Sequence, residues 1–300
     1  MFKKSIIFQI FLIFISINTL PACFFKKREK VVVPNLNSEK NVTIFVHGTL
    51  PPLIAKLANK LDCPIGLTRF NDMSIFSFTK RIAKAMHKTD PEQFNLNNFH
   101  FFGWSGKLSF EERKKAAEHL YNEIKKVSGK IILIGHSHGG NVALHLAEVA
   151  EKNNDTSLQI DKLVLMGTPV QHVTEHLANS DIFKKVISLF SRTDNIQVLD
   201  PQGLYKETQQ IDSFKKYFFS QRMFNNSDKV IHARVLFNKS NPSHIDFITP
   251  KFAKFIPDIL KIVERQSLTS DQIYTINLNN NQKIAHIVHL KKFGSHKKYI

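Results

Sequence analysis

One serine in the chain stands in a local pattern that is typical of a nucleophile. Gly135, Ser137 and Gly139 form the motif G-x-S-x-G, which lies between the apolar run of residues 130–134 and an apolar-periodic stretch over residues 140–150. A serine on such a sharp strand-to-helix turn projects its hydroxyl clear of the sheet, and the flanking glycines relieve crowding. The start of the helix behind the serine favours negative charge at this point. The motif predicts nucleophilic catalysis by Ser137.

The motif requires a strand before it and a helix after it, and such pairs recur along the chain. Short apolar runs rich in β-branched and aromatic residues predict strands, and longer stretches with apolar residues at helical spacing predict helices. Predicted strands cover residues 41–46, 99–104, 130–134, 163–166, 186–190 and 230–237, and predicted helices cover residues 51–60, 75–87, 108–126, 140–150 and 252–263. Residues 51–98 contain no strong strand signal. This alternation predicts an α/β fold with a mostly parallel twisted sheet and helices on both faces.

Three further short motifs stand at the ends of predicted strands. They are VHGT at residues 46–49, FGWSG at residues 102–106 and MGTP at residues 166–169. Together with the serine motif, their order and placement resemble the α/β-hydrolase family, in particular its bacterial lipase-like and esterase-like members. The resemblance extends over most of residues 41–260. It implies the α/β-hydrolase fold, a His-Gly turn that supplies one oxyanion-hole amide, and a Gly-Thr-Pro turn of the kind found in lipases.

The resemblance also implies a base and an acid for the serine, in the chain order Ser, Asp or Glu, His. Asp194 directly follows the predicted strand at residues 186–190, and His244 follows the one at residues 230–237. Sites in open parallel sheets gather at the carboxyl ends of the strands, where both residues lie. We therefore expect a triad of Ser137, His244 and Asp194. Asp200, which also follows a strand-like stretch, is the alternative acid.

The other histidines near these motifs fit a catalytic role less well. His232 stands at the start of its predicted strand, and His136 and His138 flank the serine on a turn that directs their side chains away from its hydroxyl. No carboxylate or cysteine near His136 and His138 in the sequence completes a set of metal ligands, so we predict no metal site. Asp246 is too close to His244 in the chain to face its imidazole.

The expected chemistry is ester hydrolysis through an acyl-enzyme intermediate. The backbone amides of His138 and Thr49, or of Leu50 in place of Thr49, would hold the oxyanion. No cofactor is implied. A lipid or another apolar acyl ester is the favoured substrate, although peptidase, thioesterase and small-ester activities use the same triad. The alternative function is a catalytically silent binding protein of the cell envelope built on the same fold.

The N-terminal residues have the pattern of an export signal. Lysines at positions 3 and 4 precede a mostly apolar run at residues 5–20, which is short for a membrane span. The sequence LPAC at residues 20–23 resembles the lipobox of bacterial lipoproteins, although Pro21 departs from that pattern. Lipidation of Cys23, simple secretion and an uncleaved membrane anchor all remain open. Each alternative predicts an exported protein, and two of them predict membrane association through the N-terminus.

Composition is consistent with one exported globular domain carrying appendages. The net charge of +17 comes from lysines spread along the chain, and no recognition module is present, so we expect no nucleic-acid partner. Cys23 and Cys63 are too few for a disulfide scaffold. The expected organisation is a signal or anchor at residues 1–22, a basic tether at 23–40, the hydrolase domain at 41–266 and a basic extension at 267–300. Two alternating segments in the extension could pair as a β-hairpin. The sequence carries no signal for an oligomeric state.

Overall fold

The computed structural model describes residues 41–49, 64–75, 77–204, 218–225, 227–279 and 284–292. The chain divides into units of residues 1–32 and 33–300, and every described residue belongs to the second. The predicted signal, tether and helix at residues 51–60 lie outside the described residues, as do Cys23, Leu50 and Cys63. Within the described ranges, no helix is both long and apolar enough to cross a membrane.

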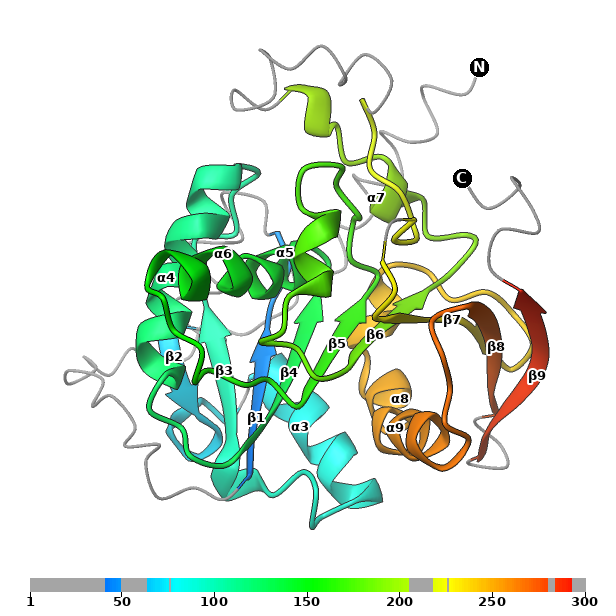
Figure 1. Cartoon of the computed structure of the whole chain (residues 1–300). Coiled ribbons are helices and arrows are strands. Elements are labelled where there is room, and N and C mark those ends of the chain that lie inside the picture. Colours follow the sequence, from blue (N-terminus) through cyan, green and yellow to red (C-terminus); the bar gives the residue numbers. More distant parts are fainter. Residues whose placement is uncertain are drawn as a thin grey trace, which may run out of the picture. The chain divides into compact units, whose positions relative to one another are not determined.

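A mixed sheet forms the centre of the described part of the chain. Its nine strands follow the order β2-β3-β1-β4-β5-β6-β7-β8-β9 (Figure 1). All neighbours from β3 to β8 run parallel, whereas β2 runs antiparallel to β3 and β9 antiparallel to β8. The strands are β1 Asn41–Val46, β2 Gly66–Arg69, β3 Phe99–Gly103, β4 Lys130–His136, β5 Lys162–Met166, β6 Val186–Phe190, β7 Val230–Phe237, β8 Gln272–Asn279 and β9 Ile284–Lys292. The prediction of a mostly parallel sheet is confirmed.

Helices cover both faces of the sheet because alternate strand residues point to opposite sides. In β4, Ile131 and Leu133 pack in one apolar cluster with residues of α4, α5 and α6, whereas Ile132 and Ile134 pack in a second cluster with residues of α3, α8 and α9 (Figure 1). The helices are α3 Phe78–Thr89, α4 Phe110–Ile124, α5 His138–Leu144, α6 Leu146–Lys152, α7 Asn195–Val198, α8 Pro250–Ala253 and α9 Ile256–Arg265. Short 3-10 turns lie at Phe70–Asp72, Leu96–Asn98, Glu175–Asn179, Gln202–Leu204 and Ile245–Ile248.

Two predicted helices are divided in the structure. The helix predicted at residues 140–150 begins at His138 and is interrupted at His145, between α5 and α6. The helix predicted at residues 252–263 is split into α8 and α9, with Pro257 in the first turn of the second. Proline has no N–H to continue the hydrogen bonding of the preceding turn, which explains the second division.

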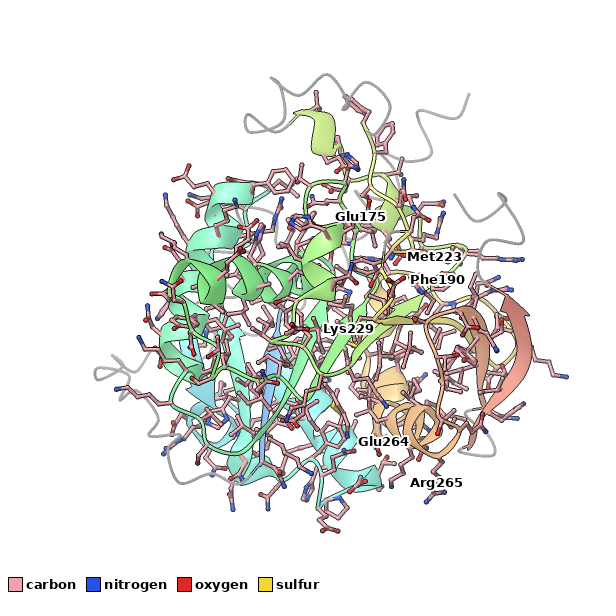
Figure 2. The ribbon with its side chains drawn as sticks, in the orientation of Figure 1. Glu175, Phe190, Met223, Lys229, Glu264 and Arg265 are labelled. Carbon is pink, nitrogen blue, oxygen red and sulfur yellow. The ribbon has the colours of Figure 1, made fainter. Side chains whose placement is uncertain are left out.

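The prediction that residues 51–98 contain no strong strand was wrong. Gly66–Arg69 forms β2, whose four residues carry no apolar run and pair only with β3 at the edge of the sheet. Such a short strand is held by its neighbour rather than by its own pattern. At the other edge, β8 pairs parallel to β7 and antiparallel to β9, so the C-terminal segments continue the same sheet. A small apolar cluster of Phe190, Met223 and Ile273 joins this end to β6, and Figure 2 labels the first two of these residues.

Several buried histidines lie in or beside the sheet. His100 in β3 and His232 in β7 are fully buried, and burial lowers the pKa of each to about 4. Burial likewise lowers the pKa of His138 and His145 and brings the pKa of His136 well below 6.5. In an unfolded chain these imidazoles would bind protons near pH 6.5. Folding therefore holds them neutral at pH values where the unfolded chain protonates them.

We expect the free energy of unfolding to fall as the pH drops from 6.5 toward 4. A histidine whose pKa is lowered by folding contributes its full stability above the unfolded pKa and loses it below, because only the unfolded state gains the proton. His100 and His232 alone should remove about 2–3 kcal/mol per pH unit between pH 6 and 5. Urea unfolding at a series of pH values measures the slope. His232→Gln should flatten it by about half of that amount, and a free energy that is flat over this range would contradict the prediction.

Candidate active site

Ser137 sits on a strained turn between β4 and α5. Its φ of 52° and ψ of −132° lie in a region that residues other than glycine seldom adopt. The backbone N–H of Ser137 donates to the carbonyl of Met166 at the end of β5, at 2.9 Å. A Cβ on Gly139 would come within 2.4 Å of the carbonyl oxygen of Val46, so that position requires glycine. The local geometry is the sharp strand-to-helix turn that the motif predicts.

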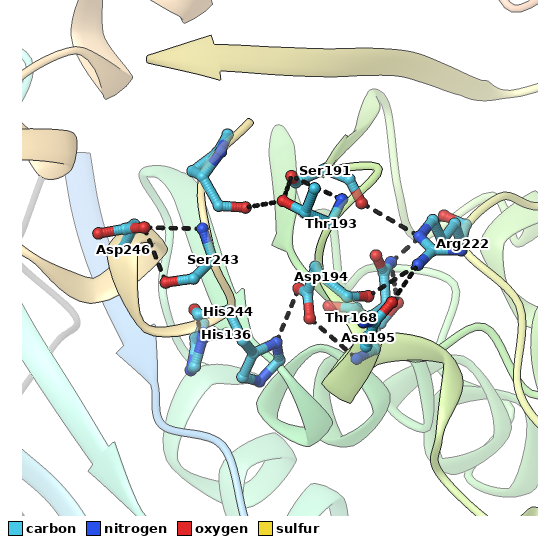
Figure 3. A network of polar contacts seen from close by, with 12 residues as sticks. His136, Thr168, Ser191, Thr193, Asp194, Asn195, Arg222, Ser243, His244 and Asp246 are labelled. Atoms are coloured by element: carbon cyan, nitrogen blue, oxygen red, sulfur yellow. Dashed lines mark hydrogen bonds and ion pairs between the residues drawn. The ribbon is translucent and has the colours of Figure 1, made fainter. Parts of the chain in front are cut away.

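Asp194 and His244 meet at the carboxyl ends of β6 and β7. The Nδ1 atom of His244 lies 2.8 Å from Oδ2 of Asp194, and the other carboxylate oxygen accepts the backbone N–H of Gln197 at 3.0 Å (Figure 3). The Asp194 side chain is fully buried, and that of His244 is 9% exposed. An ionised carboxylate only accepts hydrogen bonds, so this contact places a proton on Nδ1, and in the neutral imidazole Nε2 is then the acceptor.

The end of β5 brings this pair next to the serine. Met166 accepts the Ser137 N–H, and the following residue, Gly167, lies against both His244 and Asp194. A Cβ on Gly167 would stand 2.9 Å from Oδ2 of Asp194 and 3.3 Å from Nδ1 of His244. Among the described residues, Ser137 Oγ has no hydrogen-bond partner. The structure thus brings the three predicted residues to one edge of the sheet, with a direct hydrogen bond between the acid and the histidine.

The turn after β1 packs directly against the serine. A Cβ on Gly48 would lie 2.7 Å from the Cβ of Ser137. His47 holds this turn, since its Nδ1 contacts the Gly48 carbonyl at 2.7 Å and its Nε2 accepts the backbone N–H of Trp104 at 3.1 Å. Thr49 follows and is partly buried. The second predicted oxyanion residue, His138, is the first residue of α5 on the other side of Ser137.

Residues 114–217 match the family described as "PGAP1-like alpha/beta domain". This span includes β4, the serine turn, α5 and the Asp194 loop. The match and the strand order of the sheet agree on the same fold. The chain has the α/β-hydrolase fold. No match was found among curated protein sequences. Among solved structures, it is similar to the esterase domain of a Rhodothermus marinus protein, with 13% identity, coverage of 77% of this chain and 88% of the other, and a TM-score of 0.36.

Two other solved structures show weaker similarity. An esterase from Pyrobaculum calidifontis shares 12% identity over 80% of this chain and 67% of its own, with a TM-score of 0.32. A thioesterase of the prodiginine biosynthetic pathway from Streptomyces coelicolor shares 11% identity over 74% of this chain and 73% of its own, with a TM-score of 0.28.

Asp200, the alternative acid, faces His138 and Gln171 and not His244. Its carboxylate contacts Nε2 of His138 at 3.4 Å and Nε2 of Gln171 at 2.8 Å, and no contact with His244 is formed. Asp246 accepts from the backbone N–H and the hydroxyl of Ser243, both at 2.7 Å, and so shapes the loop before His244 (Figure 3). Asp194 is the carboxylate that the fold presents to His244.

Arg222 is a residue of the site that sequence reasoning missed. Its Nε donates to the carbonyl of Ser191 and its Nη2 to the carbonyl of Asp194, both at 3.1 Å (Figure 3). Arg222 thereby holds the loop that carries the candidate acid against the segment that precedes β7. No sequence motif marks it, because its partners, two backbone carbonyls and the Asn195 side chain, lie about 30 residues earlier in the chain.

His136 contacts the histidine of the pair rather than the serine. Its Nε2 lies 3.1 Å from the carbonyl of His244, and the two rings are 4.7 Å apart between centroids. Burial, followed by the neighbouring His244, lowers the pKa of His136 well below 6.5, so its ring is neutral at pH 7. The carbonyl can only accept, which places the His136 proton on Nε2. His136 therefore supports the loop that carries His244 through a hydrogen bond to its backbone.

Replacing Gly167 with alanine should damage the Asp194–His244 pair. Gly167 has a φ of 56°, which strains an L-residue, and the added Cβ would overlap the carboxylate oxygen that bonds His244. We expect ester turnover to fall by about 10- to 100-fold, since misplacement by a fraction of an ångström disrupts a catalytic hydrogen bond. Steady-state kinetics on a p-nitrophenyl ester measures this.

The matched control is Gly66→Ala. Gly66 has a φ of 96° at the start of β2, where its new Cβ would face the ring of His119 at 3.3 Å. It shares the backbone strain of the Gly167 variant and lies far from the pair in the sheet order. Equal losses of kcat in the two variants would show that backbone strain alone, and not the contact with the pair, explains the effect.

Proposed function

We propose that the protein is a serine ester hydrolase in which Ser137 is the nucleophile, His244 the general base and Asp194 the residue that orients the base. The observation that carries this proposal is the buried 2.8 Å contact between His244 and Asp194 beside a serine on a strained turn. A free serine hydroxyl is a weak nucleophile and needs such a base. In the neutral imidazole, the hydrogen bond from Nδ1 to Asp194 selects the tautomer in which Nε2 of His244 can accept the serine proton.

In the first half of the reaction, Oγ of Ser137 attacks the ester carbonyl carbon while its proton moves to Nε2 of His244. Asp194 stabilises the imidazolium that results. The carbonyl oxygen becomes an oxyanion, which the backbone amides of His138 and Thr49 would hold. When the tetrahedral intermediate collapses, the ester C–O bond breaks, and His244 gives its proton to the departing alkoxide. An acyl group remains on Ser137.

In the second half, water replaces the alcohol. His244 takes a proton from water as its oxygen attacks the acyl carbon, and a second oxyanion forms in the same place. Collapse breaks the bond to Ser137 Oγ, which recovers its proton from His244, and the carboxylic acid leaves. Each oxyanion donor is worth about 2.7–4 kcal/mol in an enzyme where one was removed. The scheme uses only groups of this chain and water.

Exposed apolar side chains on segments that neighbour the pair in the chain support an ester with an apolar acyl group. The exposed large hydrophobic residues on segments next to the candidate acid and base are Ile196, Leu199, Leu204, Phe218, Phe219 and Ile245. Segment 218–220 is joined to the loop after α7, because Gln202 Nε2 donates to the Phe219 carbonyl at 2.7 Å and Ser220 N–H donates to the Asp200 carbonyl at 3.2 Å. Exposed apolar groups gathered in this way are typical of surfaces that bind apolar ligands.

A panel of p-nitrophenyl esters of increasing acyl length tests this function. We expect turnover that rises with chain length and disappears in Ser137→Ala. Turnover confined to short chains would indicate an esterase for small acids and contradict the apolar acyl group. No turnover on any ester, together with no labelling by a fluorophosphonate, would favour the catalytically silent binding protein.

We also propose that the protein is exported and associates with the membrane through its N-terminus. The support is the basic start, the apolar run and the LPAC sequence that ends at Cys23. Lipid on Cys23 would hold the hydrolase beside its apolar substrate. Intact-mass measurement of the protein from its source cells tests this, since lipidation adds acyl chains to a chain that starts at Cys23. A mature protein with an unmodified Met1 start in the cytosol would contradict the proposal.

A further inference from the structure

Four buried polar side chains form a closed ring next to the serine turn. Arg113 comes from α4, His138 from the start of α5, Gln171 from the loop after β5, and Asp200 from the loop after α7. None of them is more than 6% exposed. Their separation along the chain means that only the tertiary fold brings them together. We call this set the Arg113–Asp200 ring.

Two neutral side chains connect a cation to an anion in this ring. Arg113 Nη1 lies 3.4 Å from Nδ1 of His138, and Arg113 Nη2 donates to Oε1 of Gln171 at 3.3 Å. On the opposite side, Nε2 of His138 lies 3.4 Å from Oδ1 of Asp200, and Nε2 of Gln171 donates to Oδ2 at 2.8 Å. His138 and Gln171 therefore bridge the guanidinium and the carboxylate in parallel.

The chemistry of the two ends determines the direction of every contact. A guanidinium can only donate and a carboxylate can only accept. Nδ1 of His138 must then be the acceptor for Arg113, so the ring proton sits on Nε2 and faces Asp200. Burial, followed by the positive charge of Arg113, lowers the pKa of His138, which keeps this imidazole neutral at pH 7. The Gln171 amide has a single orientation for the same reason.

We propose that the Arg113–Asp200 ring positions the backbone amide of His138 toward the oxyanion, with Asp200 as the positioning residue at its negative end. This inference rests on the proposed function. His138 directly follows Ser137, and both nitrogens of its imidazole have a partner in the ring, which restrains the side chain and the backbone that carries it. Asn141 adds a contact to Nδ1 of His138 at 3.3 Å and donates to the Pro169 carbonyl at 3.0 Å.

Stability alone is a weak reason for such an arrangement. Burying a guanidinium and a carboxylate costs desolvation free energy, and replacing buried ion pairs with well-packed apolar side chains is often neutral or stabilising. An oxyanion donor, by contrast, must be held in place before the reaction, because its catalytic effect comes from preorganisation. A ring with one permitted set of hydrogen-bond directions meets that requirement.

The test exchanges the anion between two positions of the ring. Asp200→Asn replaces the carboxylate with an amide. Whichever way the amides at positions 171 and 200 are turned, two hydrogen-bond donors then face each other at one of the four contacts of the ring. Adding Gln171→Glu removes the conflict. The new carboxylate at position 171 accepts from Arg113 and from the new amide at position 200, whose oxygen still accepts from His138. The double variant D200N/Q171E therefore keeps the charges and restores all four contacts.

We expect D200N to lower kcat on a p-nitrophenyl ester by about 10- to 100-fold, with KM changed by less than about threefold, because the oxyanion forms only during the reaction. D200N/Q171E should recover kcat to within about fivefold of the wild type, although it alters two positions instead of one. A role in folding alone predicts no such division between kcat and KM. An unchanged kcat in D200N, or a double variant as slow as D200N, would overturn the inference.

If D200N does not fold, His138→Gln and His138→Leu give the same answer. A glutamine at this position can accept from Arg113 and donate to Asp200, and we expect it to retain kcat to within about fivefold, while leucine loses about 10- to 100-fold. Equal kcat in these two variants would overturn the inference. Ser137→Ala separates the two proposals: turnover that survives it overturns the proposed function, whereas turnover that requires Ser137 and ignores D200N overturns only the ring's role.

Discussion

Ser137→Ala is expected to lower kcat for ester hydrolysis by about 10⁴- to 10⁶-fold, close to the loss of all covalent catalysis. The alanine removes the hydroxyl that is proposed to attack the substrate and leaves the strained turn, the Asp194–His244 contact and the His47 turn in place. Binding should therefore change little. Steady-state kinetics and fluorophosphonate labelling followed by mass spectrometry measure the effect, and the label should map to the peptide that contains Ser137.

The matched control is Ser157→Ala. Ser157 is an exposed serine after α6, and its hydroxyl contacts Asp155 at 2.6 Å, remote from the turn. Its loss should leave kcat within about twofold of the wild type, as is usual for surface substitutions. Retention of labelling and turnover in the Ser137 variant would remove the serine from the mechanism, however well the fold is preserved.

The second large effect is expected for Asp194→Asn, which should lower kcat by about 10⁴-fold while the protein stays folded. The amide is isosteric with the carboxylate but can present its NH₂ group to Nδ1 of His244. The imidazole would then carry its proton on Nε2, where it cannot accept a proton from Ser137. The buried carboxylate oxygen that His244 now contacts at 2.8 Å makes this site sensitive to that exchange.

Two further Asp→Asn variants make the result specific. Asp181→Asn removes an exposed carboxylate whose contact is with Lys229, and it should leave kcat within about twofold. Asp200→Asn should fall between the two, by about 10- to 100-fold, through the His138 amide. If D200N lost more activity than D194N, the orienting role would belong to Asp200 and the proposed triad would be incorrect.

The serine turn could be read from the sequence because its causes are local. The apolar run of β4, the glycine at position 139 and the first helical residues of α5 are contiguous, and the positive φ of Ser137 follows from joining them tightly. The parallel strands were predictable for a similar reason, since β1, β4, β6 and β7 are short, mostly apolar segments, as is usual for strands of a sheet covered on both faces. β2 has no such run and was missed.

The sequence narrowed the choice of the carboxylate that contacts His244 to two residues but could not assign it. Asp194 and Asp200 follow the same strand, and each is a carboxylate in a loop near α7. Asp194 caps α7 and turns its free oxygen to His244, whereas Asp200 comes after α7 and turns toward His138 and Gln171. This difference depends on the path of one short helix. Arg222 could not be found from the sequence either, because its partners are mainly backbone carbonyls of a distant segment and no motif marks them.

The sequence by itself determined the nucleophile turn, the parallel sheet and the edge of that sheet where a site would form. Only the tertiary structure decided which carboxylate meets His244 and that Arg113, His138, Gln171 and Asp200 close into a ring. Periodicity and backbone strain are properties of neighbouring residues, so they can be read along the chain. Hydrogen bonds between distant segments depend on how each crossover returns to the sheet, and the sequence pattern does not contain that path.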